Sequence, residues 1–65
     1  MNRGNFVTYS FTYFNEDGKI QGWCLVMNNI GDESSQDIQA INSFYKKFPS
    51  CLISGMIKNY HNDNE

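Results

Sequence analysis

The clearest structural signal in the sequence is Phe6–Phe14, FVTYSFTYF. Large side chains alternate with Thr and Ser, and the odd positions hold Val7, Tyr9, Phe11 and Tyr13. A period of two residues, built from β-branched and aromatic side chains, is typical of a β-strand. The sequence therefore predicts a strand over these residues.

A tight turn and a second strand are predicted next. Asn15–Gly18, NEDG, ends in Asp-Gly, a pair that tolerates the positive φ angles of a hairpin turn. Lys19–Asn28, KIQGWCLVMN, is then expected to form the second strand of the hairpin. Apolar side chains stand on both parities of this segment, which makes both of its faces candidates for burial.

An amphipathic helix of roughly three to four turns is predicted after the hairpin. Its apolar residues recur at helical spacing and are Ile38, Ile41, Phe44, Tyr45 and Phe48. Ser34 or Ser35 is the expected N-cap, and Ser34 as cap would place Asp37 close to the acidic position of a capping box. Pro49 is expected to stop the helix, because proline disfavours helical backbone in the residue before it.

A third strand, Cys51–Lys58 (CLISGMIK), completes a predicted β-β-α-β order. Strict alternation would put Cys51, Ile53, Gly55 and Ile57 on one face and Leu52, Ser54 and Met56 on the other. The expected fold class is α+β, with a three-stranded antiparallel-type sheet and one amphipathic helix packed on one face. A single domain is expected over residues 1–65, with an ordered core at about 5–58 and a polar tail at 59–65.

One helix covers only one face of such a sheet, so apolar side chains are expected on the other face. Some of the side chains of Trp23, Leu25, Met27, Leu52 and Met56 are expected to reach solvent there. Exposed apolar patches usually mark interaction surfaces, and Trp and Met are common at their anchors. Trp23, Met27 and Met56 are therefore candidates either for a partner-binding hot spot or for a homodimer seam. The complete partner-binding set predicted is Trp23, Leu25, Met27, Met56, Tyr9 and Tyr13.

Length and composition favour self-association. A chain of 65 residues buries only about 60% of its unfolded surface, and so small a core needs additional support. Two cysteines do not make a disulfide scaffold, whereas an aromatic content of 15% favours dense ring packing and association, with a homodimer expected. The sequence shows neither a signal-peptide pattern nor a membrane-spanning apolar run, so a cytoplasmic location with reduced thiols is expected.

The sequence offers little for catalysis or for metal binding. Cys24, Cys51 and His61 lack the close spacing of a zinc site, so no metal is predicted and both cysteines are expected to be buried in strands. Turn chemistry and helix capping account for the acidic residues, which are Glu16, Asp17, Asp32, Glu33 and Asp37. Gly22 and Gly55 are expected to pack under the helix. A core of this size offers no pocket that tunes a carboxyl pKa, so neither enzyme activity nor a cofactor is predicted.

Charge argues against nucleic acid as the partner. The net charge is -2, and only Lys46 and Lys47 are adjacent among the basic residues. A basic stripe is the usual footprint of nucleic-acid binding, so a regulator that stacks bases on the aromatic strand is kept only as an alternative. A further alternative is an oligomeric sponge for a nucleotide second messenger, in which Arg3, Lys46 and Lys47 bind phosphates at the oligomer interface.

Three short segments carry a resemblance to a known group of proteins. They are V-T-Y-S-F-T-Y at Val7–Tyr13, G-W-C-L-V-M at Gly22–Met27 and S-x-D-I-x-x-I at Ser35–Ile41. With them the chain resembles small uncharacterised phage and prophage proteins that share a short β-β-α-β layout, over about residues 5–58. The resemblance implies a non-enzymatic accessory protein that binds and inhibits a host defence protein in the host cytoplasm. We expect such binding to use an exposed sheet face.

Overall fold

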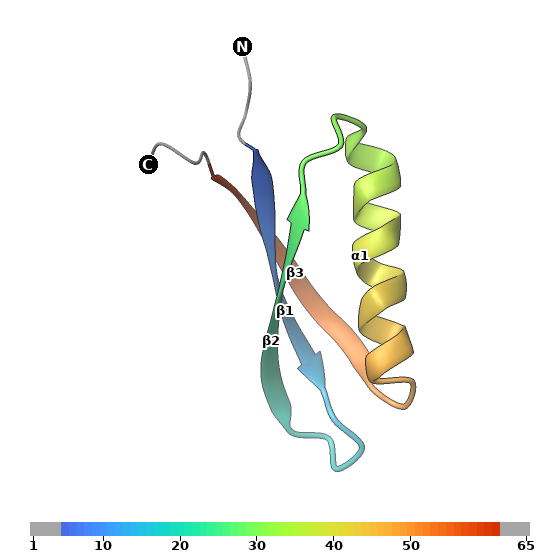
Figure 1. Cartoon of the computed structure of the whole chain (residues 1–65). Helices are drawn as coiled ribbons and strands as arrows, with labels where there is room; N and C mark the ends of the chain where they lie inside the picture. Colours follow the sequence, from blue (N-terminus) through green and yellow to red (C-terminus); the bar gives the residue numbers. More distant parts are fainter. Residues whose placement is uncertain (1–4, 62–65) are drawn as a thin grey trace.

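The chain forms a three-stranded sheet with one helix packed across it. The computed structural model describes residues 5–61. It contains strand β1 (Phe6–Phe14), strand β2 (Ile20–Asn28), helix α1 (Glu33–Lys47) and strand β3 (Leu52–His61). The strand order is β2-β1-β3 and both pairings are antiparallel. Helix α1 lies along one face of this sheet (Figure 1), which confirms the α+β class and the β-β-α-β order.

The hairpin between β1 and β2 is held by Asn15 and Gly18. The Asn15 side-chain oxygen accepts hydrogen bonds from the backbone N–H groups of Asp17 (2.9 Å) and Lys19 (3.0 Å). Gly18 has a φ of 81°, which a residue with a side chain rarely adopts. The turn therefore lies where the Asp-Gly pair predicted it, between β1 and β2.

The N-cap of helix α1 lies two residues before Ser34, the first of the two predicted caps. The N-cap is Asp32, in extended conformation, and its side chain accepts a hydrogen bond from the Ser35 N–H at 3.4 Å. Gly31, with a φ of 84°, turns the chain directly before this cap. The prediction of Ser34 or Ser35 as cap is therefore wrong. Aspartate serves as well as serine at an N-cap, so the residue type alone does not decide among these positions.

The buried stripe of α1 is rotated from the one predicted. Gln36, Ala40 and Phe44 are its buried residues, whereas Ile38 is 59% exposed. The Gln36 side-chain oxygen accepts a hydrogen bond from the Ile30 N–H at 2.9 Å, which satisfies this oxygen in its buried position. At the other end, the Phe48 N–H bonds to the Phe44 carbonyl at 2.8 Å and the helix stops before the proline, as predicted.

The core is mainly aromatic. All four odd-position side chains of β1 from Val7 to Tyr13 are at most 6% exposed. Phe44 of α1 packs into their centre, with ring centroids 5.2 Å from Phe11 and 5.0 Å from Tyr13. Trp23 of β2 adds a further ring at 6.0 Å from Phe44. Ring pairs at these distances stabilise beyond their buried area, which supports so small a core.

A bulge in β3 changes which of its side chains share a face. Thr12 pairs with Gly55, but Tyr13 pairs with Ile53, so Ser54 is an extra residue. Ile53 and Met56 consequently both pack on the core, and the strict alternation predicted for this strand is wrong. The strand also runs to His61, so residues 59–61 of the predicted tail belong to the sheet, and 62–65 lie outside the described residues.

Candidate functional site

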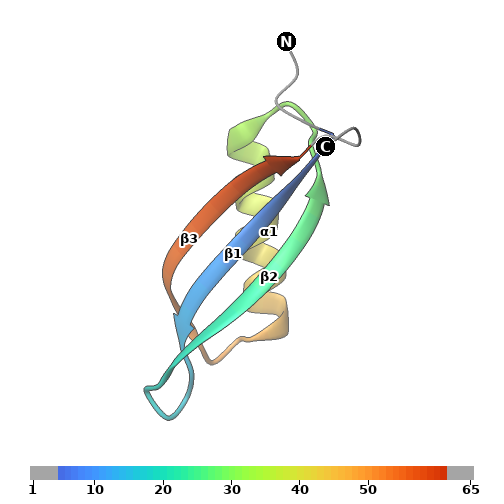
Figure 2. The same ribbon diagram turned by 90° about the vertical axis from the view of Figure 1, so that its left-hand side faces the viewer.

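The sheet has one face that no described element covers, and we call it the open face. In Figure 2 the three strands lie in front of α1, and this face is turned toward the viewer. Residues directly opposite each other in paired strands share a face, so the even positions of β1 identify the open-face residues of its neighbours. The open face consists of Phe6, Thr8, Ser10, Thr12, Phe14, Ile20, Gly22, Cys24, Val26, Asn28, Leu52, Gly55, Ile57, Asn59 and His61.

The open face is apolar at its sides and uncharged throughout. Four aliphatic side chains on the two outer strands are 62–64% exposed, namely Ile20, Val26, Leu52 and Ile57. Small hydroxyl side chains follow the central strand between them. None of the open-face residues is Asp, Glu, Lys or Arg, so every charged residue of the described chain lies elsewhere. A sheet face that meets only solvent is usually polar, so this composition makes the open face a candidate interface.

The middle of the open face carries little side-chain volume. Thr12 lies in register between Gly22 and Gly55. A Cβ added at Gly55 would meet nothing within 4 Å, so the prediction that these glycines pack under the helix is wrong. Cys24 is exposed beside Ser10, with its Sγ 3.6 Å from the serine oxygen, whereas it was predicted to be buried; Cys51 is half-buried.

The residues predicted to bind a partner lie on the opposite, helix-covered face. Tyr9 and Tyr13 are buried, and Trp23, Leu25, Met27 and Met56 are partly buried against the core. Of the residues from which the exposed set of the uncovered face was expected, Leu52 lies on the open face, whereas Trp23, Leu25, Met27 and Met56 do not.

The register of the hairpin explains this error. Trp23 pairs with Phe11 and Leu25 pairs with Tyr9, so the larger apolar side chains of both strands face the helix together. That register comes from the loop Glu16–Gly18, in which Asn15 bonds to Lys19 and Gly18 takes the positive φ. A two-residue Asp-Gly loop would shift the pairing by one residue and turn Cys24 and Val26 toward the helix.

The basic residues of the nucleotide-binding alternative do not form a site among the described residues. Arg3 lies outside the described range, and Lys46 and Lys47 stand in the last turn of α1. Lys47 lines a cavity of about 390 Å³ next to the β1–β2 turn, together with Glu16 and Asp17. Two carboxylates beside one ammonium group disfavour a phosphate ligand there.

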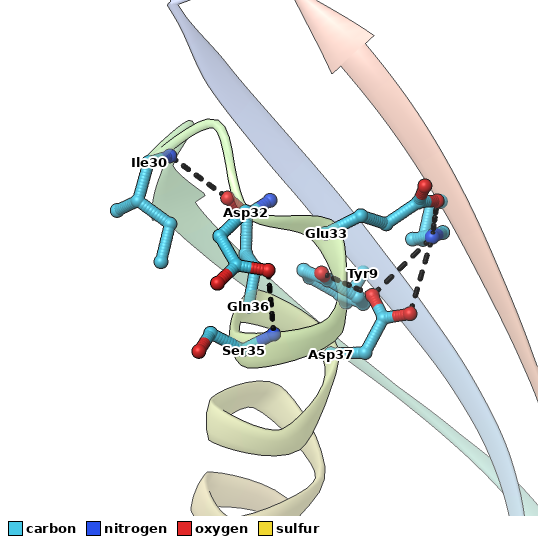
Figure 3. A network of polar contacts seen from close by, with 8 residues as sticks. Tyr9, Ile30, Asp32, Glu33, Ser35, Gln36 and Asp37 are labelled. Atoms are coloured by element: carbon cyan, nitrogen blue, oxygen red, sulfur yellow. Dashed lines mark hydrogen bonds and ion pairs between the residues drawn. The ribbon is translucent and has the colours of Figure 1, made fainter.

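A polar network joins the helix start to β1 and β3 on the covered face. The Tyr9 hydroxyl donates to the Asp37 carboxylate at 2.7 Å (Figure 3). The Lys58 ammonium lies 3.3 Å from Asp37 and also contacts Glu33. Burial, followed by the bond to Asp37, raises the pKa of Tyr9 to about 12. The bond to Glu33 is the main cause that raises the pKa of Lys58 to about 12. These carboxylates are thus engaged in structural contacts.

The remaining polar candidates are dispersed over the fold. The His61 ring stacks on the Phe6 ring, with centroids 5.3 Å apart. Residues 5–61 contain no group of three or more side chains that could hold a metal ion. No helix in that range is long and apolar enough to cross a membrane.

Comparisons of the chain with protein-family models, with curated proteins and with solved structures found no match.

Proposed function

We propose that this chain is a non-enzymatic protein-binding module that docks a partner protein on its open face. The observation that carries the proposal is the combination of exposed Ile20, Val26, Leu52 and Ile57 with the absence of any charged side chain from that face. Covering such side chains removes apolar area from water, at roughly 25 cal/mol per Å². This term favours association without requiring a catalytic group.

The chemistry of the open face also specifies the partner. An uncharged face gains nothing from a charged surface and would leave buried charges of that surface without compensation. The partner surface is therefore mainly apolar and uncharged, with hydroxyl or amide groups to meet the Thr and Ser side chains of β1. Binding of this kind depends little on ionic strength, because screening acts on charges.

The resemblance to phage accessory proteins supports a host protein as this partner, and inhibition as the result. Neither point follows from the geometry of the sheet, so both stay proposals that rest on the resemblance. Nucleic acid is a poor fit to the same face, since phosphate recognition needs Lys or Arg.

The test compares two open-face variants with a matched control on the helix. Val26→Lys and Ile57→Lys each place a charge on the open face, while Ile38→Lys places the same charge at a similarly exposed position of α1. Each tagged protein is incubated with bacterial lysate, and the proteins that it retains are compared after washes at low salt and at about 0.5 M NaCl.

A partner that binds the open face is retained by the wild type and by Ile38→Lys at both salt concentrations, and is lost from both open-face variants. Equal retention by all four proteins places the contact elsewhere and contradicts the proposal. Retention that disappears at high salt contradicts it as well, because it indicates a charged interface.

A further inference from the structure

The two edges of the sheet are protected to different degrees. An edge strand presents free backbone N–H and C=O groups, and natural proteins block these with bulges, charged side chains or covering elements. The β3 edge has all of these: a bulge at Ser54, the charged Lys58, and the Tyr45 hydroxyl, which accepts a hydrogen bond from the Ile53 N–H at 3.2 Å. Pairing along β3 is therefore obstructed.

The β2 edge has none of these protections. Its nine residues, IQGWCLVMN, include no charged residue and no proline, and their pairing with β1 runs in one regular register. The strand order places β2 at the outside of the sheet, and no described strand lies beyond it. A regular, uncharged edge of this length is a template for another strand.

The backbone groups on the free side of β2 belong to its even positions. The Asn15 N–H bonds to the Lys19 carbonyl and the Asn29 N–H bonds to the Asn5 carbonyl, one at each end of the β1–β2 ladder. Hydrogen-bonded pairs alternate along an antiparallel ladder, so the odd positions of β2 bond to β1. The even positions direct their N–H and C=O groups outward; they are Ile20, Gly22, Cys24, Val26 and Asn28.

We propose that β2 of a second copy of this chain pairs antiparallel with β2 along this edge, centred on Cys24, to form a six-stranded sheet. The two-fold axis then stands perpendicular to the sheet, so both helices lie on one side and the two open faces become continuous on the other. The proposed dimer uses the β2 edge of the sheet, whereas the proposed binding of a partner protein uses the open face. Either proposal can therefore fail without the other.

The edge is self-complementary in this register. Centring on Cys24 pairs all nine residues, with Ile20 opposite Asn28 and Gly22 opposite Val26 of the second copy. No like charges meet, because the strand has none. On the helix side Trp23 comes opposite Leu25 of the second copy, which covers two side chains that the single chain buries only in part. An unrelated peptide satisfies the same backbone groups but lacks this match of side chains over the whole strand.

The proposal is tested with a charge pair at the two-fold axis. Cys24 is exposed and pairs only with itself in this dimer, so Cys24→Lys and Cys24→Glu each oppose like charges without disturbing the core. Each variant should raise the dissociation constant of the dimer by on the order of tenfold or more, and an equal mixture of the two should restore the dimer. Sedimentation equilibrium gives the masses, and circular dichroism establishes that each variant is folded.

Two further measurements separate the edge from the open face. Ile57→Lys lies on the open face of β3, away from the β2 edge, and should leave the dimer intact. Oxidation with diamide should link the dimer through Cys24, in Cys51→Ser but not in Cys24→Ser, because paired Cα atoms about 5.5 Å apart lie within disulfide reach. A monomeric wild type at about 100 μM, well above a micromolar dissociation constant, overturns the proposal. A dimer that survives Cys24→Lys but is lost in Ile57→Lys overturns it too, since that dimer uses the faces.

Discussion

The two faces of the sheet are formed by the same three strands, yet they differ in side-chain size and in charge. The covered face carries Tyr9, Phe11, Tyr13 and Trp23 and includes the charged Lys58, held by two carboxylates of the helix. The open face carries aliphatic, hydroxyl and amide side chains, with Phe6, Phe14 and His61 at its ends, and it has no Asp, Glu, Lys or Arg. The aromatic side chains of the covered face form the core, while the side chains of the open face take no part in it. Substitutions on each face can test this division.

The largest effect is expected for Phe44→Ala on the covered face. Phe44 is fully buried and contacts the rings of Phe11, Tyr13 and Trp23. Truncating a buried phenylalanine costs about 3–5 kcal/mol, which equals the whole stability that a core of this size usually provides. We expect Phe44→Ala to be mostly unfolded in circular dichroism at room temperature.

Ile38→Ala is the control for this prediction, because Ile38 lies on the same helix and is 59% exposed. It should keep the spectrum and the urea midpoint of the wild type to within about 0.5 kcal/mol. A Phe44→Ala protein that stays as stable as this control would mean that the aromatic core does not maintain the fold.

A smaller loss is expected for Tyr9→Phe, which removes only the hydroxyl that donates to Asp37 at 2.7 Å. A hydrogen bond to a charged acceptor contributes about 1.5–3 kcal/mol, and Asp37 keeps Lys58 as a partner in the variant. Urea unfolding measures the loss. In an Asp37→Ala background the same substitution should cost much less, and equal costs in both backgrounds would contradict coupling between the two side chains.

The same network makes stability fall at alkaline pH. The pKa of Tyr9 is raised from 10.0 to about 12, and that of Lys58 from 10.5 to about 12. Above pH 10 the unfolded chain releases protons that the folded chain retains, so the free energy of unfolding declines as pH rises toward 12. Below pH 10 this contribution is fully present.

Urea titrations between about pH 9 and about pH 11 measure this decline, and Tyr9→Phe should reduce its slope while leaving the part due to Lys58. A slope that is unchanged in Tyr9→Phe would show that the tyrosine does not titrate differently in the folded and unfolded chains. Tyr45→Phe is a suitable control for the loss of a tyrosine hydroxyl, because Tyr45 lies outside this network.

The element order and the hairpin were predictable because their signals are local. The alternation in Phe6–Phe14, the Asp-Gly turn and the proline after the helix each act on neighbouring residues, and the structure confirms all three. The presence of one uncovered face also followed, since one helix cannot cover both sides of a sheet.

The residues of that face were not predictable from alternation alone. Their assignment needed the register across the hairpin, which turns Trp23 toward Phe11, and the bulge at Ser54, which reverses the alternation within β3. A bulge leaves no clear mark in a single sequence, apart from the glycine beside it. The burial of Gln36 was missed for a similar reason, because its partner, the Ile30 N–H, becomes apparent only once the loop is folded.

The smallest effect is expected for Val26→Thr on the open face, and it gives the most direct comparison of the two faces. Val7 and Val26 belong to neighbouring strands, but Val7 is fully buried and Val26 is 62% exposed. Valine and threonine have the same shape, so the substitution tests only the polarity of each site. Val7→Thr buries a hydroxyl and should cost about 1–3 kcal/mol in urea unfolding, whereas Val26→Thr should change stability by less than about 0.5 kcal/mol.

Val26→Thr should nevertheless weaken retention of the partner protein, because the methyl group that it replaces lies on the open face. A Val26→Thr protein as destabilised as Val7→Thr would mean that the open face is already covered within the folded protein, and it would remove the basis for a docking surface there.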